Sequence, residues 1–230
     1  MLASIIVPVL NEAPAIEGVL QRLQPLREFS EVIVVDGGSS DDTPALARPY
    51  ADKVITSRRG RSTQMNLGAE NAQGDWLVFL HADTYLPDTF MAGSLATLNE
   101  HVGWGFFRVR LSGSHRLLRV VETFMNWRSR LSQIATGDQV IFVQSRLFYK
   151  LGGFPDIPLM EDVAFSSILK NHSAPHVMKT RVTTSSRRWE DRGIVKTVLL
   201  MWWLRFRFYC GAEPIKLAKA YYPNVKLDSK

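Results

Sequence analysis

Short apolar runs recur in the first third of the chain, and segments with helical periodicity separate them. Each run is rich in β-branched or aromatic residues, a pattern typical of strands that are buried on both faces of a parallel sheet. In the first intervening segment Ile16, Val19, Leu20 and Leu23 recur at helical spacing. The pattern predicts strands at 4–10, 31–35, 54–55 and 76–80, and helices at 15–26, from Pro44 onward and at 61–72.

This alternation before residue 84 indicates right-handed βαβ units. We therefore expect an α/β fold with a mostly parallel central sheet that helices flank. Pro8 lies within the first run. Because proline has no backbone N–H, the first strand should stop at Pro8 or lie at a sheet edge there. Thr43 is the expected cap of the helix that starts at Pro44.

The alternation loosens after residue 84. In the segment 104–111, Phe107, Val109 and Leu111 alternate with two arginines, which predicts an antiparallel strand. We expect a smaller antiparallel part and C-terminal helices here, and no linker divides the chain. The remaining pattern predicts helices at 88–98 (with Asp88 as cap), 117–131, 163–169 and 194–209 (with Gly211 as its stop), a strand at 140–143 and an edge strand at 177–183.

Composition narrows the class of protein. The chain has 230 residues, 46% of them hydrophobic and 22% charged, as in a soluble globular protein. Its net charge of +6 favours an anionic partner such as a nucleotide, a phosphorylated substrate or an acidic membrane face. Zinc-finger spacing, RNP motifs and long basic runs are absent, so we expect no nucleic-acid partner. The single cysteine and the lack of a signal-peptide pattern lead us to expect a cytoplasmic location.

Two carboxylates follow strands of the predicted parallel sheet. Asp36 ends the strand 31–35, and Asp83 lies just past the strand 76–80. Ligands of open α/β sheets bind outside the carboxyl ends of the strands, so Asp36 is placed to accept from a base or a ribose, and Asp83 to meet a metal or a phosphate ester. Asp83 also suits a turn, and both interpretations remain open. The residues after Asp36 match neither GxGxxG nor a Walker pattern, which disfavours a redox dinucleotide site and P-loop chemistry.

Two charged segments further along have a similar ambiguity. The arginines of 57–61 either neutralise a diphosphate or form a solvated surface cluster. Glu161 and Asp162 open a helix after a Gly-Gly-Phe-Pro turn, either as a capping pair or with a catalytic base in a sheltered pocket. The segment 137–139 would help to line such a pocket.

Taken together and in order, these motifs become specific. They are Pro-Val-Leu-Asn-Glu at 8–12, Val-Val-Asp-Gly-Gly-Ser-Ser-Asp-Asp-Thr at 34–43, Gly-Arg and Gln-Met-Asn-Leu-Gly-Ala within 60–69, Phe-Leu-His-Ala-Asp-Thr at 79–84, Gly-Asp-Gln at 137–139 and Met-Glu-Asp-Val at 160–163. The set resembles family-2 glycosyltransferases of the GT-A fold over about residues 3–170. It is most similar to the short bacterial branch that has His-Ala-Asp where most relatives have Asp-x-Asp.

The resemblance implies site residues by position. For the nucleotide, the matching residues are Pro8, Asn11 and Glu12 in the nucleoside loop, Asp36 at the base, typically uracil, and Arg61, Asn66 and Ala82 beside them. Asp83 matches the main metal ligand, with Mn²⁺ or Mg²⁺ as the expected cofactor. His81 replaces the first Asp of the motif, and its imidazole is the poorer ligand because these hard cations favour oxygen.

The resemblance also implies the reaction. Asp162 matches the general base of inverting members, and Asp138, Gln139 and Glu161 are expected at the acceptor or the diphosphate. Relatives often supply a late His to the metal; residues 184–189 contain none, so Arg187 and Arg188 are expected to meet the diphosphate instead. The expected activity is metal-dependent transfer of a sugar, with inversion, from a nucleotide diphosphate sugar, UDP-linked, to an acceptor hydroxyl.

The expected organisation is one domain, 1–230, with a nucleotide-binding half at about 1–84, an acceptor half at about 85–190 and C-terminal helices at 191–230. Two alternatives remain. A nucleotidyltransferase would need a glycine-rich loop after the first strand, which 9–12 does not supply. A non-catalytic nucleotide-sugar-binding protein stays open because the first Asp and the late His are missing.

The last long helix, 194–209, is apolar nearly all round and rich in aromatic residues, and basic residues follow. One interpretation is a core helix packed on the sheet. The other is peripheral docking on an anionic inner membrane, with a lipid-linked acceptor, since aromatic and basic residues together suit the headgroup boundary. Residues that would add to a positive face are Arg116, Arg119, Arg128, Arg130, Lys216 and Lys219.

Overall fold

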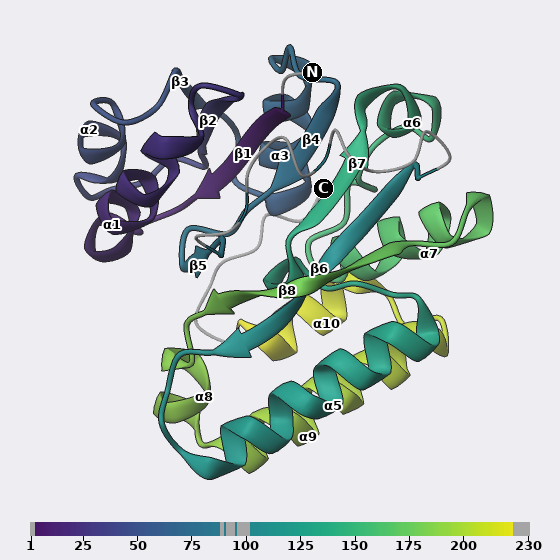
Figure 1. Ribbon diagram of the computed structural model, residues 1–230. Helices are drawn as coiled ribbons and strands as arrows, with labels where there is room; N and C mark the ends of the chain where they lie inside the picture. Colours follow the sequence, from purple (N-terminus) through teal and green to yellow (C-terminus); the bar gives the residue numbers. More distant parts are fainter. Residues whose placement is uncertain (1–2, 88–89, 91–94, 96–101, 223–230) are drawn as a thin grey trace.

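A single mixed sheet runs through the computed structural model, which describes residues 3–87, 90, 95 and 102–222 (Figure 1). Its strands lie in the order β3-β2-β1-β4-β7-β6-β8-β5, and the first four of these are parallel. This confirms the predicted α/β fold with a mostly parallel sheet. The parallel strands are β1 (Ala3–Val9), β2 (Ser30–Asp36), β3 (Lys53–Thr56) and β4 (Trp76–Phe79).

The other half of the sheet is mixed. β7 (Ile141–Gln144) runs antiparallel to both of its neighbours, β4 and β6 (Trp104–Leu111). β6 therefore has the predicted antiparallel partner, but it also pairs in parallel with β8 (His176–Thr184). β5 (Thr84–Tyr85) pairs only with the end of β8, so the rest of β8 forms a sheet edge among the described residues, as predicted.

Helices cover both faces of the sheet (Figure 1). On one face α1 (Ala13–Leu23), continued by the short η1 (Gln24–Leu26), packs Ile16 and Leu20 against Ile5 and Val7 of β1. On the other face Ile6 of β1 belongs to a second core cluster, which also contains residues of α3 (Arg61–Glu70) and α7 (Glu161–His172). Successive side chains of a strand point to opposite faces, so a strand covered on both is apolar throughout. Two further helices border the parallel strands and β7, and these are α2 (Thr43–Ala47) and α6 (Ser145–Lys150).

Pro8 is a correction to the sequence analysis. It neither ends β1 nor lies at an edge, because β1 is central and pairs with β2 through Val9. The carbonyl of Val9 accepts from Gly37 on the β2 side, whereas the carbonyl of Ile6 accepts from Leu80 on the β4 side. The missing N–H of Pro8 thus points to the β4 side, beyond the last paired residues of β4. Pro8 is also buried within the strand rather than placed in the loop that follows.

Thr43 is a second correction. It is the first residue of α2 and not its cap, and its hydroxyl accepts a 2.8 Å hydrogen bond from the backbone N–H of Glu12. The expected helix at 88–98, with Asp88 as cap, lies outside the described residues except for two isolated positions.

The second half of the chain adds a helical layer below the sheet in Figure 1. It contains α5 (Arg116–Ser132), η2 (Gly137–Gln139), α8 (Arg187–Arg192), α9 (Ile194–Tyr209) and α10 (Pro214–Tyr221). α9 buries only Thr197 and Leu204, so the core-helix interpretation of 194–209 is wrong. The neighbouring helices cover one side of α9, and its apolar residues continue onto the exposed side. None of the described helices is long and apolar enough to cross a membrane.

Candidate functional site

Charged side chains from six parts of the chain meet outside the carboxyl ends of β1 and β4. Glu12 lies in the electrostatic field of Asp83, Arg61 and Arg187. Arg61 in turn interacts with Glu161 and with Asp138. The sequence-predicted carboxylates and arginines therefore form one connected cluster, as the parallel sheet requires.

The loop after β2 is held rigidly around Asp36. This buried carboxylate accepts hydrogen bonds from the backbone N–H groups of Gly38 and Ser39, at 3.1 Å, and from the Ser39 hydroxyl, at 2.5 Å. Asn11, with φ of +54°, accepts from the backbone N–H of Ser40 at 2.8 Å. The two loops that the resemblance assigns to a nucleoside are thus joined to each other. The Ser39 N–H is shared between both carboxylate oxygens, at 3.1 and 3.2 Å, so these donors hold Asp36 in one orientation.

Gln64 is a residue that the sequence analysis quoted in a motif without giving it a function. Its side-chain amide donates to the carbonyls of Val9 and Val35, both at 2.8 Å. The Gln64 side chain therefore links the carboxyl ends of β1 and β2. A Cβ on Gly37 would lie 3.0 Å from the Gln64 amide, which explains the glycine after Asp36. A polar residue on the buried face of a helix was the signal that could have identified it.

Asn66 and Ala82 both have surroundings within the protein that the motifs do not show. The Asn66 amide donates to the carbonyl of Phe154 at 2.8 Å and accepts from its N–H at 2.9 Å, so it ties α3 to the Gly-Gly-Phe-Pro turn. The side chain of Ala82 is buried in the core, which leaves only its backbone for a ligand.

Asp83 and Glu12 bring two carboxylates together. Burial raises the pKa of Glu12, and the negative charge of Asp83 raises it further, while Arg187 opposes both effects. Nη2 of Arg187 lies 4.0 Å from Oε2 of Glu12. The backbone explains this approach, because the Asp83 carbonyl accepts from the N–H of Ser185 at 3.0 Å, just before Arg187 and Arg188. This end of β8 thus places the two arginines beside the predicted metal ligand.

His81 turns toward η2. Its Nδ1 lies 3.6 Å from Oδ1 of Asp138. The pKa of Asp138 is lowered: its burial raises the pKa, but His81 and then Arg188 and Arg61 outweigh that effect. The imidazole also packs on Gly137, where an added Cβ would lie 2.3 Å from Nε2. Both ring nitrogens thus face Gly137 and Asp138, which weakens the expectation that His81 binds a metal.

Asp162 lies beside the same glycine. Its Oδ2 accepts from the backbone N–H of Gly137, and its Oδ1 from the N–H of Val163, both at 2.7 Å. Glu161 is buried next to it, and burial and then the charge of Asp162 raise the pKa of Glu161, whereas Arg61 lowers it. His81, Gly137, Glu161 and Asp162 line one small cavity. The predicted base therefore lies in a sheltered place.

Gln139 has its partners within the protein. It is fully buried, and its Oε1 accepts from the Ser129 hydroxyl at 2.6 Å and from the backbone N–H of Thr136 at 3.3 Å. Gln139 thus caps η2 and joins it to α5, and it is not exposed to an acceptor.

Tyr221 was not foreseen from the sequence. The Arg188 guanidinium donates to its hydroxyl and lies 5.3 Å from the centre of its ring. Burial lowers the pKa of Arg61, but Tyr222, Glu161, Tyr221 and Asp138 together raise it above the usual value. The end of α10 therefore holds Arg188 and contributes to the electrostatic surroundings of Arg61, and no local pattern in the sequence shows this.

The donor chemistry suits a hard cation. Mg²⁺ sites commonly combine one or two carboxylates with phosphate oxygens of the substrate, and the Asp83 carboxylate beside Glu12 fits that pattern. Among the described residues, no three His, Cys, Asp or Glu side chains are grouped so that they could hold a metal.

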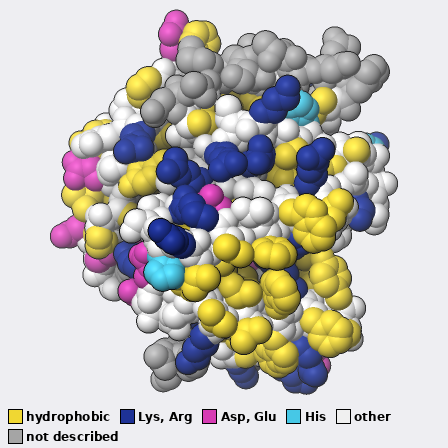
Figure 2. Space-filling view, turned by 60° about the horizontal axis from the view of Figure 1, so that its bottom comes forward, with side chains coloured by type: hydrophobic (Ala, Val, Ile, Leu, Met, Phe, Trp, Pro, Cys, Tyr) yellow, Lys and Arg dark blue, Asp and Glu magenta, His cyan; other side chains and the backbone are white. Residues whose placement is uncertain are grey.

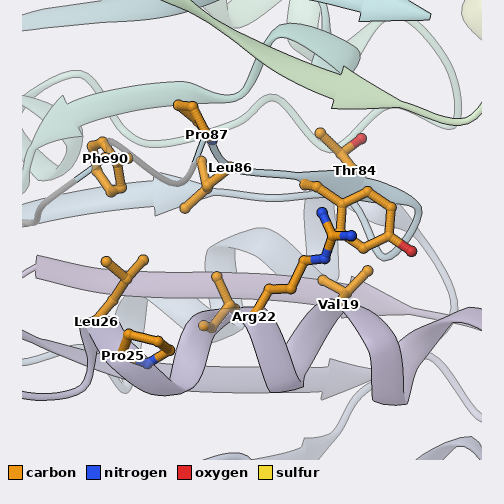
Figure 3. A pocket seen from close by; sticks show the side chains of 10 residues that line it. Val19, Arg22, Pro25, Leu26, Thr84, Leu86, Pro87 and Phe90 are labelled. Carbon is orange, nitrogen blue, oxygen red and sulfur yellow. The ribbon is translucent and has the colours of Figure 1, made fainter. Parts of the chain in front are cut away.

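A separate cavity of about 120 Å³ lies between α1 and the segment from Thr84 to Phe90 (Figure 3). Arg22 extends along it and stacks 4.4 Å from the centre of the Tyr85 ring. The residues lining this cavity include none of the predicted site residues.

Comparison with known proteins gives consistent likenesses. The sequence model described as Glycosyl transferase family 2 matches residues 4–145. A PGL/p-HBAD biosynthesis glycosyltransferase of Mycobacterium tuberculosis is 38% identical over 109 residues, which are 43% of this chain and 42% of that protein. The chain thus spans less than half of the length of that relative. An uncharacterized glycosyltransferase of Haemophilus influenzae is 25% identical over 245 aligned positions, covering 96% of this chain and 92% of that one.

Solved structures share the fold. The mannosyltransferase PcManGT from Pyrobaculum calidifontis, in complex with GDP-Man and Mn²⁺, has a TM-score of 0.62 at 21% identity and covers 99% of this chain and 65% of its own. TarS 1–349 of S. aureus, in complex with UDP, has a TM-score of 0.65 at 20% identity, with 80% and 60% covered. Both likenesses support the GT-A architecture of the sheet and helices.

Proposed function

The chain belongs to glycosyl transferase family 2, and from this premise we propose that the protein transfers a sugar from a nucleoside diphosphate sugar to an acceptor hydroxyl. One observation carries the proposal. Gly137 contacts both the imidazole of His81 and the carboxylate of Asp162, so the segment with Asp83 and the predicted base lie on two sides of one glycine. The proposed donor site and the proposed base are therefore neighbours.

For the donor we propose a uridine diphosphate sugar. Support comes from Asp36, a buried carboxylate at the end of β2 that is already oriented by three local donors and can accept from a base N–H. Arg61, Arg187 and Arg188 would bind the diphosphate, because guanidinium groups pair with phosphate oxygens in a bidentate way. Relatives of the same fold are in complex with UDP or with GDP-Man, so the base is a point for experiment.

We propose that Asp83 holds a divalent cation, Mn²⁺ or Mg²⁺, with the negative charge of Glu12 beside it. When bound, such a cation offsets negative charge on the diphosphate leaving group. The arginines of this chain act in the same sense, and stabilisation of developing charge is usually the largest catalytic contribution.

Asp162 is the proposed base. It takes the proton of the acceptor hydroxyl as that oxygen forms a bond to the anomeric carbon. The bond from the anomeric carbon to the diphosphate oxygen breaks on the opposite face, and the diphosphate leaves with the electron pair, so the configuration inverts. The backbone N–H groups of Gly137 and Val163 hold the carboxylate in place for this transfer. General base catalysis of this kind contributes about 10²–10⁴-fold in rate.

Calorimetry with UDP and with GDP, each with and without Mn²⁺, tests the donor site. We expect UDP to bind more tightly when Mn²⁺ is present. Binding of neither nucleotide under any of these conditions would overturn the proposal.

A panel of nucleotide sugars, assayed for hydrolysis with Mn²⁺, separates the proposal from its alternatives. Release of nucleoside diphosphate supports a transferase. A non-catalytic binding protein would bind the same nucleotide without releasing it, and a nucleotidyltransferase would instead consume a nucleoside triphosphate.

A further inference from the structure

Two helices of the C-terminal layer have an exposed apolar stripe. In each stripe the residues recur every three or four positions, so they lie along one side of the helix. Their exposed fractions run from 44% at Leu117 to 66% at Phe206. We call these residues together the two-helix face: Leu117, Val120, Phe124, Trp127 and Leu131 of α5, and Val195, Leu199, Trp202, Trp203, Phe206 and Tyr209 of α9.

The two stripes make one surface. α5 and α9 lie side by side at the bottom of Figure 1 and contact each other. Figure 2, which brings that bottom forward, shows hydrophobic side chains over a broad area, with Lys and Arg side chains around it. Monomeric soluble proteins rarely expose apolar surface in one large patch, so such a patch marks an interaction site.

The exposed charges on the two helices themselves have one sign. The exposed charged residues of α5 and α9 are all basic: Arg116, Arg130, Lys196 and Arg207. The one acidic residue of these two helices, Glu122, is buried and forms ion pairs with Arg119, at 3.2 Å, and Arg181, at 3.8 Å. α5 and α9 themselves are therefore complementary to an anionic partner, and the exposed acidic residues near them, Glu190 and Asp191, lie in the adjoining α8.

We propose that the two-helix face docks on an anionic lipid bilayer, with α5 and α9 lying at the level of the headgroups. Tryptophan and tyrosine suit that level because their rings are apolar and carry one polar group, and basic residues beside them attract anionic lipids. A second copy of the chain fits less well. Two such faces packed on each other in a symmetric dimer would bring their positive charges together.

This docking would also place the acceptor, a point that rests on the proposed function. Tyr209 ends the α9 stripe, and Arg128 follows Trp127 in α5. Both lie in the electrostatic field of Asp162. The bilayer would thus lie on the side of the proposed base, where an acceptor with an apolar tail and a hydroxyl in the headgroup region could reach it.

Sedimentation of the full chain with vesicles tests the docking without any nucleotide. We expect the protein to pellet with phosphatidylcholine vesicles that contain phosphatidylglycerol, and the bound fraction to fall as salt rises to about 0.5 M. Trp127→Gln with Phe206→Gln should weaken binding by about tenfold or more. Lys196→Gln and Arg207→Gln should each weaken it by about fivefold. Phe29→Gln, a change at an exposed aromatic residue outside the face, should leave binding unaltered.

Three outcomes would overturn the docking proposal. The protein could stay in the supernatant at low salt with anionic vesicles, or the Trp127 and Phe206 changes could leave binding intact. Analytical ultracentrifugation could also show a dimer that these changes dissociate, in which case the face is an interface between copies. Calorimetry with UDP on the same variants keeps the two proposals apart, because vesicle binding can fail while nucleotide binding stays intact, and the reverse.

Discussion

The backbone N–H of Gly137 donates a 2.7 Å hydrogen bond to Oδ2 of Asp162. This bond joins η2 to the first turn of α7, and the imidazole of His81 packs on the same glycine from the β4 side. η2, α7 and the segment that contains His81 are far apart in the sequence, and all three meet at Gly137, which has no side chain. Because the other carboxylate oxygen of Asp162 accepts from Val163, the proposed base cannot turn without losing two hydrogen bonds.

Asp162→Asn should separate catalysis from binding. The amide keeps the size of the carboxylate but cannot take a proton, so we expect transfer to fall by about 10²–10⁴-fold. One of the two backbone donors loses its acceptor, which should destabilise the fold by about 1–3 kcal/mol. Turnover assays test the first effect, and UDP calorimetry well below the melting temperature should show donor binding close to wild type. Wild-type turnover in this variant would exclude Asp162 as the base.

Gly137→Ala should disturb the junction of the three segments. The added Cβ would lie 2.2 Å from Cε1 of His81, and we expect a loss of about 1–3 kcal/mol in the free energy of unfolding. In the double variant with His81→Ala the methyl group has room, so part of the loss should return, as a coupling energy of about 0.5–3 kcal/mol.

Gly18→Ala in α1 is the matched control for this change. Its nearest neighbour would be the Tyr85 hydroxyl at 3.7 Å, an ordinary contact, so alanine should be neutral or stabilise by about 0.5–1 kcal/mol. Urea unfolding of the four variants and the wild type measures all of these terms. Additive losses for Gly137→Ala and His81→Ala would show that the two residues do not clash.

Asp83→Ala should abolish the metal dependence of UDP binding, whereas His81→Ala should only weaken it. The carboxylate is the better ligand for a hard cation, and both nitrogens of the His81 ring face Gly137 and Asp138. Titration of UDP at several Mn²⁺ concentrations gives the two effects. A greater loss of metal dependence for His81→Ala would reverse these assignments.

Glu161→Gln should stabilise the protein in a pH-dependent way. The pKa of this buried carboxyl is raised in the folded state by burial and by Asp162, so its ionisation opposes folding. The wild type therefore loses stability as pH rises from the ordinary pKa of the group through its raised pKa. The melting temperature of the variant should exceed that of the wild type at pH 7.5, and the gap should close toward pH 4. A gap that stays constant with pH would show that Glu161 does not titrate in this range.

The parallel part of the fold could be predicted because its signal is local. The apolar runs at 31–35 and 76–80 match β2 and β4 to within one residue, and the ends of parallel strands share one edge of the sheet. Asp36 and Asp83 were therefore placed correctly from the pattern alone. The prediction for Pro8 was wrong because a missing N–H is harmless where the neighbouring strand offers no paired residue. β4 stops pairing with β1 before Pro8, and the sequence of one strand does not show this register.

Two of the predicted site residues have partners that the sequence pattern does not show. Gln139 accepts from Ser129 and Asn66 pairs with Phe154, and no periodicity encodes such contacts. Helix 194–209 was left open because an apolar surface predicts burial or docking equally well. The layers that neighbour a helix show whether it is buried, and α9 has neighbours on one side only, whereas docking on a membrane is our proposal.

Asn66→Ala should lower the stability of the protein and leave nucleotide binding unchanged, although the family motif places Asn66 next to the nucleotide. Its amide makes two hydrogen bonds, of 2.8 and 2.9 Å, to the backbone of Phe154, and their loss leaves two partly buried backbone groups without these partners. We expect the free energy of unfolding to fall by about 1–3 kcal/mol, while the affinity for UDP with Mn²⁺ stays within about twofold. Asn71→Ala is the matched control at the C-cap of the same helix, because its exposed amide donates to the carbonyl of Leu67, and a loss of about 0.5 kcal/mol is expected. Urea unfolding and calorimetry of both variants separate the two effects. A large fall in UDP affinity for a stably folded Asn66→Ala protein would restore Asn66 to the nucleotide site.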